Sequence, residues 1–409
     1  MIDTLSISGL LSFGWEPVCL PLRSLNVLIG PNGSGKSNLL DVLELLRGLP
    51  LDYQAVIRQR GGALEWPHKD QQNQRPPDDD SLSQPIASIE AVLHGSGFRQ
   101  PIRYRVGLRR DAARMEIAEE LLETAEPYPQ DLPFQFLYAS NGSGVARVFG
   151  GPGQEPAADP LYGPYAWREL DDLDPNQSLL SKLRDAKLYP QLTRIAELFG
   201  RIRIYQSWQF GPQSALRQPQ PADQRNDALE PDARNLGLLL SNLRKDLAAR
   251  EQITKYLREV YEDVREVEVV VEGGLVQVFL IEADGRSTPA TRLSDGTLRW
   301  LALVTLLCHP KPPPLLCIEE PELGLHPDLI PTLARLLKAA AGRTQIIVTT
   351  HSDVLVSEFS DTPEDVVVCE RRGGGTSLHR LARADLERWL KDYSLGHAWR
   401  SGVIGGNRW

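Results

Sequence analysis

Short apolar runs recur along the chain, and three of them have the pattern of buried strands. These runs are Leu25–Ile29, Leu315–Ile318 and Gln345–Val348, each bounded by turn-forming or charged residues. The first is followed by apolar residues at helical spacing from Asn38, and the helical run Leu301–Leu307 precedes the second. Strands without alternation, connected through helices, are typical of sheets buried on both faces. The pattern predicts an α/β fold with a mixed or parallel core sheet.

A second pattern occupies the middle of the chain. Apolar and polar residues alternate in 86–92 and 102–108, and again in 134–138 and 145–149, around glycine-containing turns. Such pairs predict antiparallel hairpins. Next come helical patterns at 178–199 and 235–262, a hairpin at Gly273-Gly274, and near the C-terminus a strand at 365–370 followed by a helix at 384–391.

The strand Leu25–Ile29 leads into a loop that can bind phosphate. The loop reads Gly30-Pro31-Asn32-Gly33-Ser34-Gly35-Lys36-Ser37 and matches G-x-x-x-x-G-K-[ST] at every position. Glycines let consecutive backbone N–H groups face a polyphosphate, and the following helix N-terminus adds positive potential. Lys36 would contact the β- and γ-phosphates, and Ser37 would bind Mg²⁺. A plain glycine turn opening a helix is the alternative, but the flanking strand and helix favour nucleotide binding.

Two carboxylates end the second apolar run. Glu319 and Glu320 are adjacent, and successive strand side chains point to opposite faces, so they can have different roles. One can hold the hydration shell of Mg²⁺, and the other can polarise an attacking water. A charged strand end without function is the alternative.

Polar residues also follow the other apolar segments. His351 stands where the third strand meets its loop, a place where a lone histidine is usually a surface residue. The turn Leu293-Ser294-Asp295-Gly296 enters the helix Leu301–Leu307. Ser294 can be an ordinary helix cap, or the helix N-terminus can be an anion site.

Together and in this order, the motifs resemble the ABC-type ATPases of the SMC/RecF/OLD-like branch, closest to compact bacterial AAA family ATPases without a fused nuclease domain. Gly30–Ser37 is similar to Walker A, Leu293–Gly296 to the signature, and Leu315–Glu320 to Walker B. Glu322–Pro327 looks like the D-loop, and Thr350–Ser352 like the switch histidine. The likeness covers the start of the chain to about Leu46 and the stretch from Arg292 onward.

The resemblance implies a homodimer in which two heads enclose two ATP molecules with Mg²⁺. The implied ATP-binding residues are Gly30, Pro31, Asn32, Gly33, Ser34, Gly35, Lys36, Ser37 and Asn38, and Leu293, Ser294, Asp295 and Gly296 would face the partner's ATP. Glu320 would be the catalytic base, His351 would contact the γ-phosphate, and Ser37 and Glu319 would serve the metal. Glu319 departs from the more usual Asp, and Thr297 from the glutamine of transporters. Gln59 and Gln206 are both candidates for the Q-loop glutamine.

In these terms we expect one ATPase head made of four consecutive parts. They are 1–60 with Walker A, 61–175 as an antiparallel β lobe with loops, 176–264 as a helical insertion, and 265–409 with the signature, Walker B, switch histidine and tail. The leucine spacing from Leu236 to Leu247 falters near Arg250, so no long coiled-coil arm is expected. Because few residues follow His351, we expect no OLD-type nuclease domain after it.

Composition and charge limit the class of protein and the compartment that we expect. The 409 residues are 41% hydrophobic and 24% charged, as in ordinary globular proteins, and the net charge of −9 argues against a DNA-coating protein. Arginines alternate with apolar residues at 103–105 and 201–205; a solvated sheet face is the first interpretation and DNA contact the second. The four cysteines are scattered, no run reaches the ~18 apolar residues of a membrane span, and Met1–Leu5 does not begin a signal peptide, so we expect a cytoplasmic protein and no membrane partner.

We therefore expect an ATPase whose ATP-driven dimerisation regulates DNA transactions or a separate effector, a nuclease or toxin, in DNA repair or anti-phage defence. Two alternatives stay open: the nucleotide-binding subunit of a transporter, and a scaffold that binds ATP without turnover. The tryptophans of the tail, Trp389, Trp399 and Trp409, either pack on the core or dock a partner.

Overall fold

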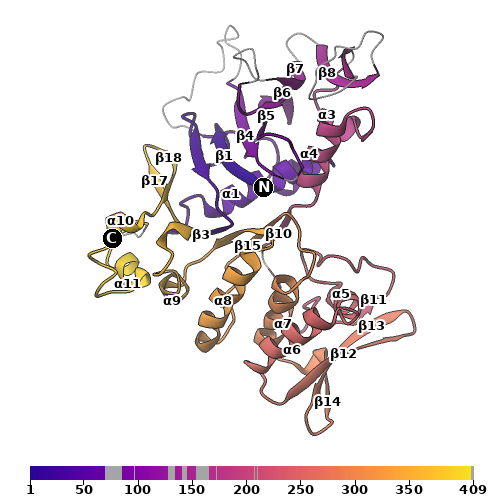
Figure 1. The fold of residues 1–409 in the computed structure, drawn as a ribbon, viewed down its shortest axis with the longest axis vertical. Helices are drawn as coiled ribbons and strands as arrows, with labels where there is room; N and C mark the ends of the chain where they lie inside the picture. Colours follow the sequence, from indigo (N-terminus) through magenta and orange to yellow (C-terminus); the bar gives the residue numbers. More distant parts are fainter. Residues whose placement is uncertain are drawn as a thin grey trace. The chain divides into compact units, whose positions relative to one another are not determined.

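The computed structural model describes residues 1–69, 85–95, 97–127, 134–140, 145–152, 165–171, 173–206, 208–209 and 211–406 (Figure 1). The predicted turn at 141–144 and Trp409 lie outside these residues. The chain divides into two compact units. Unit 1 comprises Met1–Arg23, Gly30–Ile202 and Val368–His379, and unit 2 comprises Ser24–Ile29, Arg203–Val367 and Arg380–Trp409.

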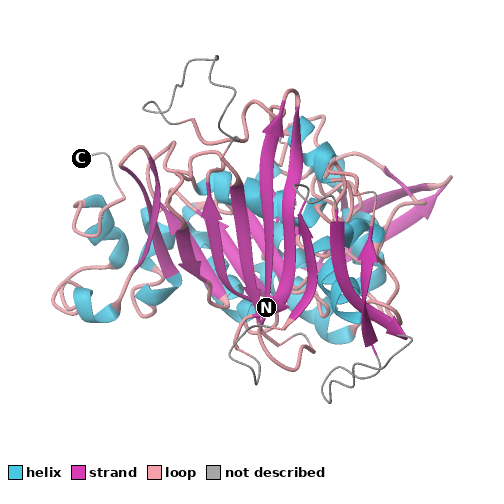
Figure 2. Cartoon of the chain, turned by 90° about the horizontal axis from the view of Figure 1, so that it is seen from above, coloured by secondary structure: helices cyan, strands magenta, loops and turns pink. Residues whose placement is uncertain are grey.

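Unit 1 contains an eight-stranded antiparallel sheet in the order β2-β1-β4-β5-β6-β7-β8-β9, whose long strands are visible in Figure 2. The strands are β1 (Ile2–Ser8), β2 (Val18–Pro21), β4 (Ala87–Leu93), β5 (Ile102–Asp111), β6 (Arg114–Thr124), β7 (Gln135–Ser140), β8 (Val145–Pro152) and β9 (Tyr165–Leu170). Both predicted hairpins are confirmed as the pairs β4–β5 and β7–β8. The sheet also recruits β1 and β2 from the first part of the chain, which the sequence pattern did not assign to it.

The strand β6 and the helix α3 are joined by a buried carboxylate. The helices of unit 1 are α1 (Lys36–Gly48), α2 (Tyr53–Gln59), α3 (Leu179–Lys182) and α4 (Pro190–Gly200). Glu120 on β6 is 1% exposed and accepts hydrogen bonds from Tyr104 Oη (2.8 Å), Ser178 Oγ (2.7 Å) and Leu179 N (2.9 Å). Burial raises the pKa of this carboxyl. Pro190 stands in the first turn of α4, where its missing N–H costs nothing.

Unit 2 contains the three strands predicted from apolar runs. The parallel strands β10 (Arg203–Tyr205), β15 (Leu315–Glu319), β16 (Gln345–Thr349) and β3 (Leu25–Ile29) are neighbours in this order. They belong to a six-stranded sheet that also contains β17 (Val366–Arg372) and β18 (Gly375–Arg380). Every residue of β3 and β16 is buried. Because the four strands run parallel, their carboxyl ends lie at one edge of the sheet.

The remaining elements of unit 2 include the predicted hairpin around Gly273-Gly274, formed by β12 and β13. The strands are β11 (Gln220–Pro221), β12 (Val264–Glu272), β13 (Leu275–Glu282) and β14 (Ser287–Pro289). The helices are α5 (Leu236–Leu243), α6 (Leu247–Arg258), α7 (Asp295–Leu307), α8 (Ile330–Ala341), α9 (Asp353–Ser357), α10 (Arg383–Leu386) and α11 (Leu395–Arg400). Asp246 caps α6 by accepting a bond from Ala249 N, which explains why the helical pattern at 235–262 is two helices.

The C-terminal region corrects one prediction. The helix expected at 384–391 is wrong in length, because α10 ends at Leu386. Beyond it the backbone forms tight turns, with Trp389 N donating to Leu386 O at 3.0 Å. Trp399 is 8% exposed and donates from Nε1 to Gly406 O (3.0 Å), whereas Trp389 is 41% exposed. Across the residues that the structure describes, no helix has the length and apolar character to cross a bilayer.

Candidate functional site

The glycine loop starts where β3 ends, and steric crowding explains two of its glycines. Gly30 has φ 151° and Gly35 has φ 107°, a backbone region that favours glycine. A Cβ on Gly30 would lie 2.2 Å from the Cys369 carbonyl oxygen, and one on Gly35 would lie 2.1 Å from Thr376 Oγ1. The loop therefore needs glycine at both positions, as the motif predicted.

Thr376 holds this loop, although it belongs to no recognisable motif. The residue lies on β18, is 3% exposed, and donates from Oγ1 to the Ser34 carbonyl oxygen at 2.9 Å. The same hydroxyl is hydrogen-bonded to Ser12 Oγ at 2.7 Å. Ser34 is itself 1% exposed. A contact between residues so far apart in sequence fixes the curvature of the loop between Gly33 and Lys36.

Lys36, the lysine of the motif, lies in the first turn of α1. Lys36 is 6% exposed, and its Nζ donates to the carbonyl oxygens of Gly30 (2.7 Å) and Pro31 (3.1 Å), so the ammonium is held across the loop. Ser37 is exposed, and no acidic residue lies in the first turn of α1. Backbone N–H groups, a lysine and an uncompensated helix N-terminus together favour an anion such as a phosphate chain.

At the end of β15, Glu320 adopts an unusual backbone conformation. Its φ is +43°, which is rare for a residue with a side chain and is concentrated at functional sites. Its N–H donates to the Thr349 carbonyl oxygen at 3.0 Å. Its Oε1 lies 3.6 Å from His351 Nε2, and about a third of each side chain is exposed. The structure thus places the two predicted catalytic side chains next to each other and within reach of solvent.

Glu322 anchors the segment that carries His351. Thr350 Oγ1 donates to Glu322 Oε1 at 2.5 Å, and the His351 N–H donates to the same oxygen at 3.3 Å. Thr350 N also donates to Leu28 O at 3.0 Å, which ties the segment to β3. Burial raises the pKa of Glu322. The sequence placed Glu322 in a D-loop, but did not suggest this contact with the histidine segment.

The strand register distinguishes the two glutamine candidates. Gln206 directly follows β10, whose Tyr205 is opposite Ile318 of the parallel strand β15. Gln206 therefore emerges at the same sheet edge as Glu319, Thr349 and the start of the glycine loop. Gln59 instead ends the helix α2 in unit 1. Which of the two is the Q-loop glutamine stays a prediction.

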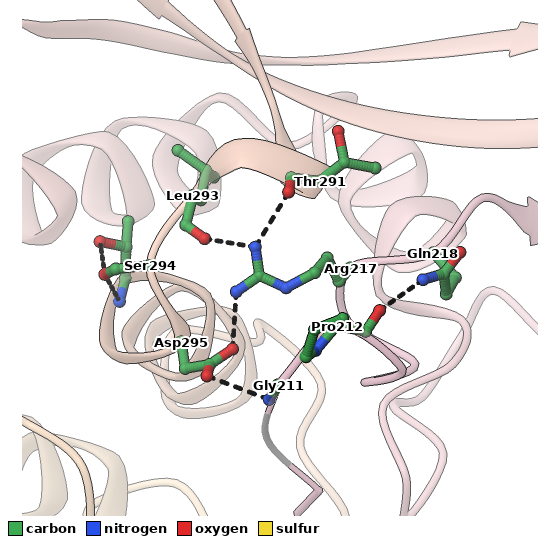
Figure 3. A network of polar contacts seen from close by, with 9 residues as sticks. Gly211, Pro212, Arg217, Gln218, Thr291, Leu293, Ser294 and Asp295 are labelled. Carbon is green, nitrogen blue, oxygen red and sulfur yellow. Dashed lines mark hydrogen bonds and ion pairs between the residues drawn. The ribbon is translucent and has the colours of Figure 1, made fainter.

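The signature turn is stabilised by an arginine from the loop before β11 (Figure 3). Arg217 Nη1 donates to the carbonyl oxygens of Thr291 (3.0 Å) and Leu293 (2.6 Å), and its Nη2 donates to Asp295 Oδ1 (2.6 Å). Asp295 Oδ2 accepts from Gly211 N at 3.0 Å. Ser294 is exposed and caps α7, because its Oγ accepts from the Thr297 N–H at 3.0 Å.

Two further contacts connect α7 to the residues around Glu320. A Cβ on Gly296 would lie 2.9 Å from the Gly324 carbonyl oxygen, so only glycine fits where the signature approaches the D-loop. Arg299 is 4% exposed, donates from Nη2 to the Glu320 carbonyl oxygen at 2.5 Å, and lies over the Trp208 ring. Burial lowers the pKa of Arg299 to about 10.

The arginine stripe on β5 faces carboxylates. Arg103 forms ion pairs with Glu90 (3.4 Å) and Glu123 (3.0 Å), and Arg105 with Glu119 (3.1 Å). These are cross-strand pairs of opposite charge, which stabilise a sheet surface. Their positive charge is therefore largely compensated, which favours the solvated sheet face over DNA contact at these residues.

The two residues predicted to hold a metal, Ser37 and Glu319, have oxygen donors. Within the described part of the chain, no three His, Cys, Asp or Glu side chains cluster as a metal site. Mg²⁺ commonly takes only one or two protein oxygens and completes its shell with phosphate and water. The hydroxyl of Ser37 and the carboxylate of Glu319 are oxygen donors of this kind.

Comparisons with known proteins identify the family and the fold of the chain. The family model described as "AAA domain, putative AbiEii toxin, Type IV TA system" matches residues 25–139 and 169–357. An SMC head solved with the C-terminal winged-helix domain of ScpA is 16% identical, with TM-score 0.53 over 95% of this chain and 99% of that chain. A Pyrococcus furiosus Smc head with an extended coiled coil, bound to the C-terminal domain of ScpA, is 15% identical, with TM-score 0.51 over 96% and 98%. No curated protein matches. The expected SMC-like P-loop ATPase fold is confirmed.

Proposed function

The chain belongs to the AAA family whose model it matches, and from this premise we propose that it is an Mg²⁺-dependent ATPase whose ATP-driven dimerisation controls a separate effector protein. One observation carries the proposal. The parallel neighbours β15, β16 and β3 end at one sheet edge, and from those ends emerge Glu320, His351 and the glycine loop. The strands that precede the proposed phosphate-binding and water-activating residues are thus neighbours in one parallel sheet, which supports the proposal.

The proposed chemistry uses these groups in turn. The ammonium of Lys36 exchanges its bonds to the loop carbonyls for bonds to the β- and γ-phosphate oxygens of ATP. Glu320 accepts a proton from the water that attacks the γ-phosphate, and His351, 3.6 Å away, contacts the transferred phosphoryl group. Mg²⁺, held through Ser37 and Glu319, would neutralise charge on the phosphates.

The second half of the site is proposed to come from another copy of the chain. Ser294 is exposed at the N-terminus of the 13-residue helix α7, and Gly296 stands in its first turn. A helix N-terminus with a hydroxyl is suited to bind the terminal phosphate of an ATP held by the partner. ATP then joins two heads, and hydrolysis separates them.

Two of the comparisons support a separate effector protein. The family's description names a toxin–antitoxin system, in which two components act together. The SMC head solved with part of ScpA is a head of similar fold that binds a separate protein. We therefore propose a protein effector, a nuclease or toxin in anti-phage defence or DNA repair, over a membrane permease.

The test compares three variants with the wild type, of which Lys69→Ala is the control. Lys36→Ala should abolish ATP binding in calorimetry, while Lys69→Ala, which removes an exposed ion pair with Glu65, should leave it unchanged. Glu320→Gln should bind ATP but hydrolyse it at least about 100-fold more slowly, because the amide cannot accept the proton. Light scattering after size exclusion should then show a more persistent ATP-dependent dimer. Wild-type turnover by Glu320→Gln would refute the assigned base.

A further inference from the structure

The signature turn is shaped by a residue outside any motif. Arg217 binds acceptors on Thr291, Leu293 and Asp295, which lie on both sides of Ser294. None of these bonds uses the Ser294 hydroxyl. The guanidinium is well shielded, with 14% of its side chain exposed, compared with 36% for Asp295. Arg217 therefore fixes the backbone around Ser294 (Figure 3), while the Ser294 hydroxyl is hydrogen-bonded to Thr297 and the residue is exposed.

The same contact also compensates the negative charge of Asp295 at the N-terminus of α7. Asp295 occupies the first turn of α7, where a carboxylate stabilises the helix but repels a phosphate. Its ion pair with Arg217 at 2.6 Å and its bond from Gly211 N compensate that charge. An anion approaching the N-terminus of α7 then meets backbone N–H groups without a bare negative charge beside them.

We propose that Arg217 is a positioning residue for turnover in the second copy of the chain: it holds the 291–295 turn and neutralises Asp295, so that Ser294 and the α7 N-terminus receive the terminal phosphate of ATP bound by the partner's glycine loop. This inference rests on the composite site proposed above. It assigns to the loop between β10 and β11 a role in the activity of the other subunit.

Substitution of Arg217 should affect turnover and not nucleotide binding. Arg217→Ala should lower kcat by about 10- to 100-fold, because the turn around Ser294 loses its support. Calorimetric ATP affinity of the monomer should stay at the wild-type value. Arg217→Lys should be intermediate, since an ammonium can pair with Asp295 but cannot reproduce the forked contact with both carbonyls. Arg225→Ala is the matched control, because among the described residues the Arg225 side chain forms its ion pair with the exposed Asp227.

A double variant distinguishes the loss of charge compensation from a loss of folding. Adding Asp295→Asn to Arg217→Ala removes the uncompensated carboxylate while its amide oxygen can still accept from Gly211 N. Turnover should rise several-fold above that of Arg217→Ala alone. A double variant that is no more active, at equal thermal stability, would overturn the electrostatic role of Arg217.

Mixing inactive variants decides whether Arg217 acts on the partner. In a mixed dimer of Lys36→Ala and Arg217→Ala, one site combines an intact glycine loop with an intact signature. Equal mixing should restore up to about a quarter of wild-type turnover, because half of random dimers are mixed and each has one good site. Ser294→Arg mixed with Lys36→Ala is the control. If the control restores activity and Arg217→Ala does not, the inference is wrong; if neither does, the composite site itself fails.

Discussion

Replacing Thr376 by valine tests whether a contact between distant parts of the sequence sets the shape of the glycine loop. Thr376 is buried and donates to the Ser34 carbonyl oxygen, and it shares a second hydrogen bond with Ser12. Valine has nearly the same shape but no hydroxyl. The variant therefore leaves a buried carbonyl without this donor directly before Gly35 and Lys36.

The size of the effect follows from the contacts. A net hydrogen bond contributes about 0.5–1.5 kcal/mol, and a buried group left unpaired costs about 1–3 kcal/mol. We expect the free energy of unfolding to fall by about 1–3 kcal/mol. If up to ~1.4 kcal/mol of this appears as disorder of the loop, ATP affinity falls by about three- to tenfold.

The assay pairs Thr376→Val with Thr376→Ser. Serine keeps the hydroxyl and loses one methyl group, which costs about 1 kcal/mol of stability through lost burial. Both variants should unfold at lower denaturant concentration, but only valine should weaken binding of a non-hydrolysable ATP analogue in calorimetry. Wild-type affinity in the valine variant, or equal loss in the serine variant, would refute the role assigned to the hydroxyl.

Two more substitutions test buried polar contacts, one beside Glu320 and one within unit 1. Arg299→Met keeps an apolar stem on Trp208 but removes the bond to the Glu320 carbonyl oxygen, so kcat should fall by about tenfold with unchanged ATP affinity; unchanged kcat would show that Glu320 needs no such support. Burial raises the pKa of Glu120 above its ordinary value of 4.5, so its contribution to stability is complete below pH 4.5 and is lost as pH rises through the folded-state pKa. Glu120→Gln should therefore flatten the fall in unfolding free energy over this range in denaturant titrations at a series of pH values, and an unchanged slope would contradict this.

The sequence predicted the motifs because their signals are local. A glycine loop between a buried strand and a helix, or an apolar run ending in two carboxylates, is legible within about ten residues. The β3, β15 and β16 strands have the predicted positions for this reason. The two hairpins and the Gly273-Gly274 turn were also found, since their alternation and turns are neighbours in sequence.

What the sequence missed depends on distant partners. Strand β6 carries several glutamates, so its alternation is obscured, and one of them, Glu120, is buried where Tyr104, Ser178 and Leu179 supply donors. Thr376 and Arg217 belong to no motif, and their roles come from residues that folding brings next to them. The position of Gln206 at the sheet edge that carries Glu319 likewise depends on the parallel register of β10 with β15.

The position of β3 in its sheet has a consequence for biosynthesis. This strand is synthesised long before its partner β16, and Asn26 Nδ2 donates to Ile346 O across 320 residues of sequence. During translation the apolar residues of β3 stay unpaired until most of the chain has been synthesised. Pairings at such separation form slowly and leave partly folded chains prone to aggregation. The sheet from which the glycine loop emerges thus forms only after β16 has been synthesised.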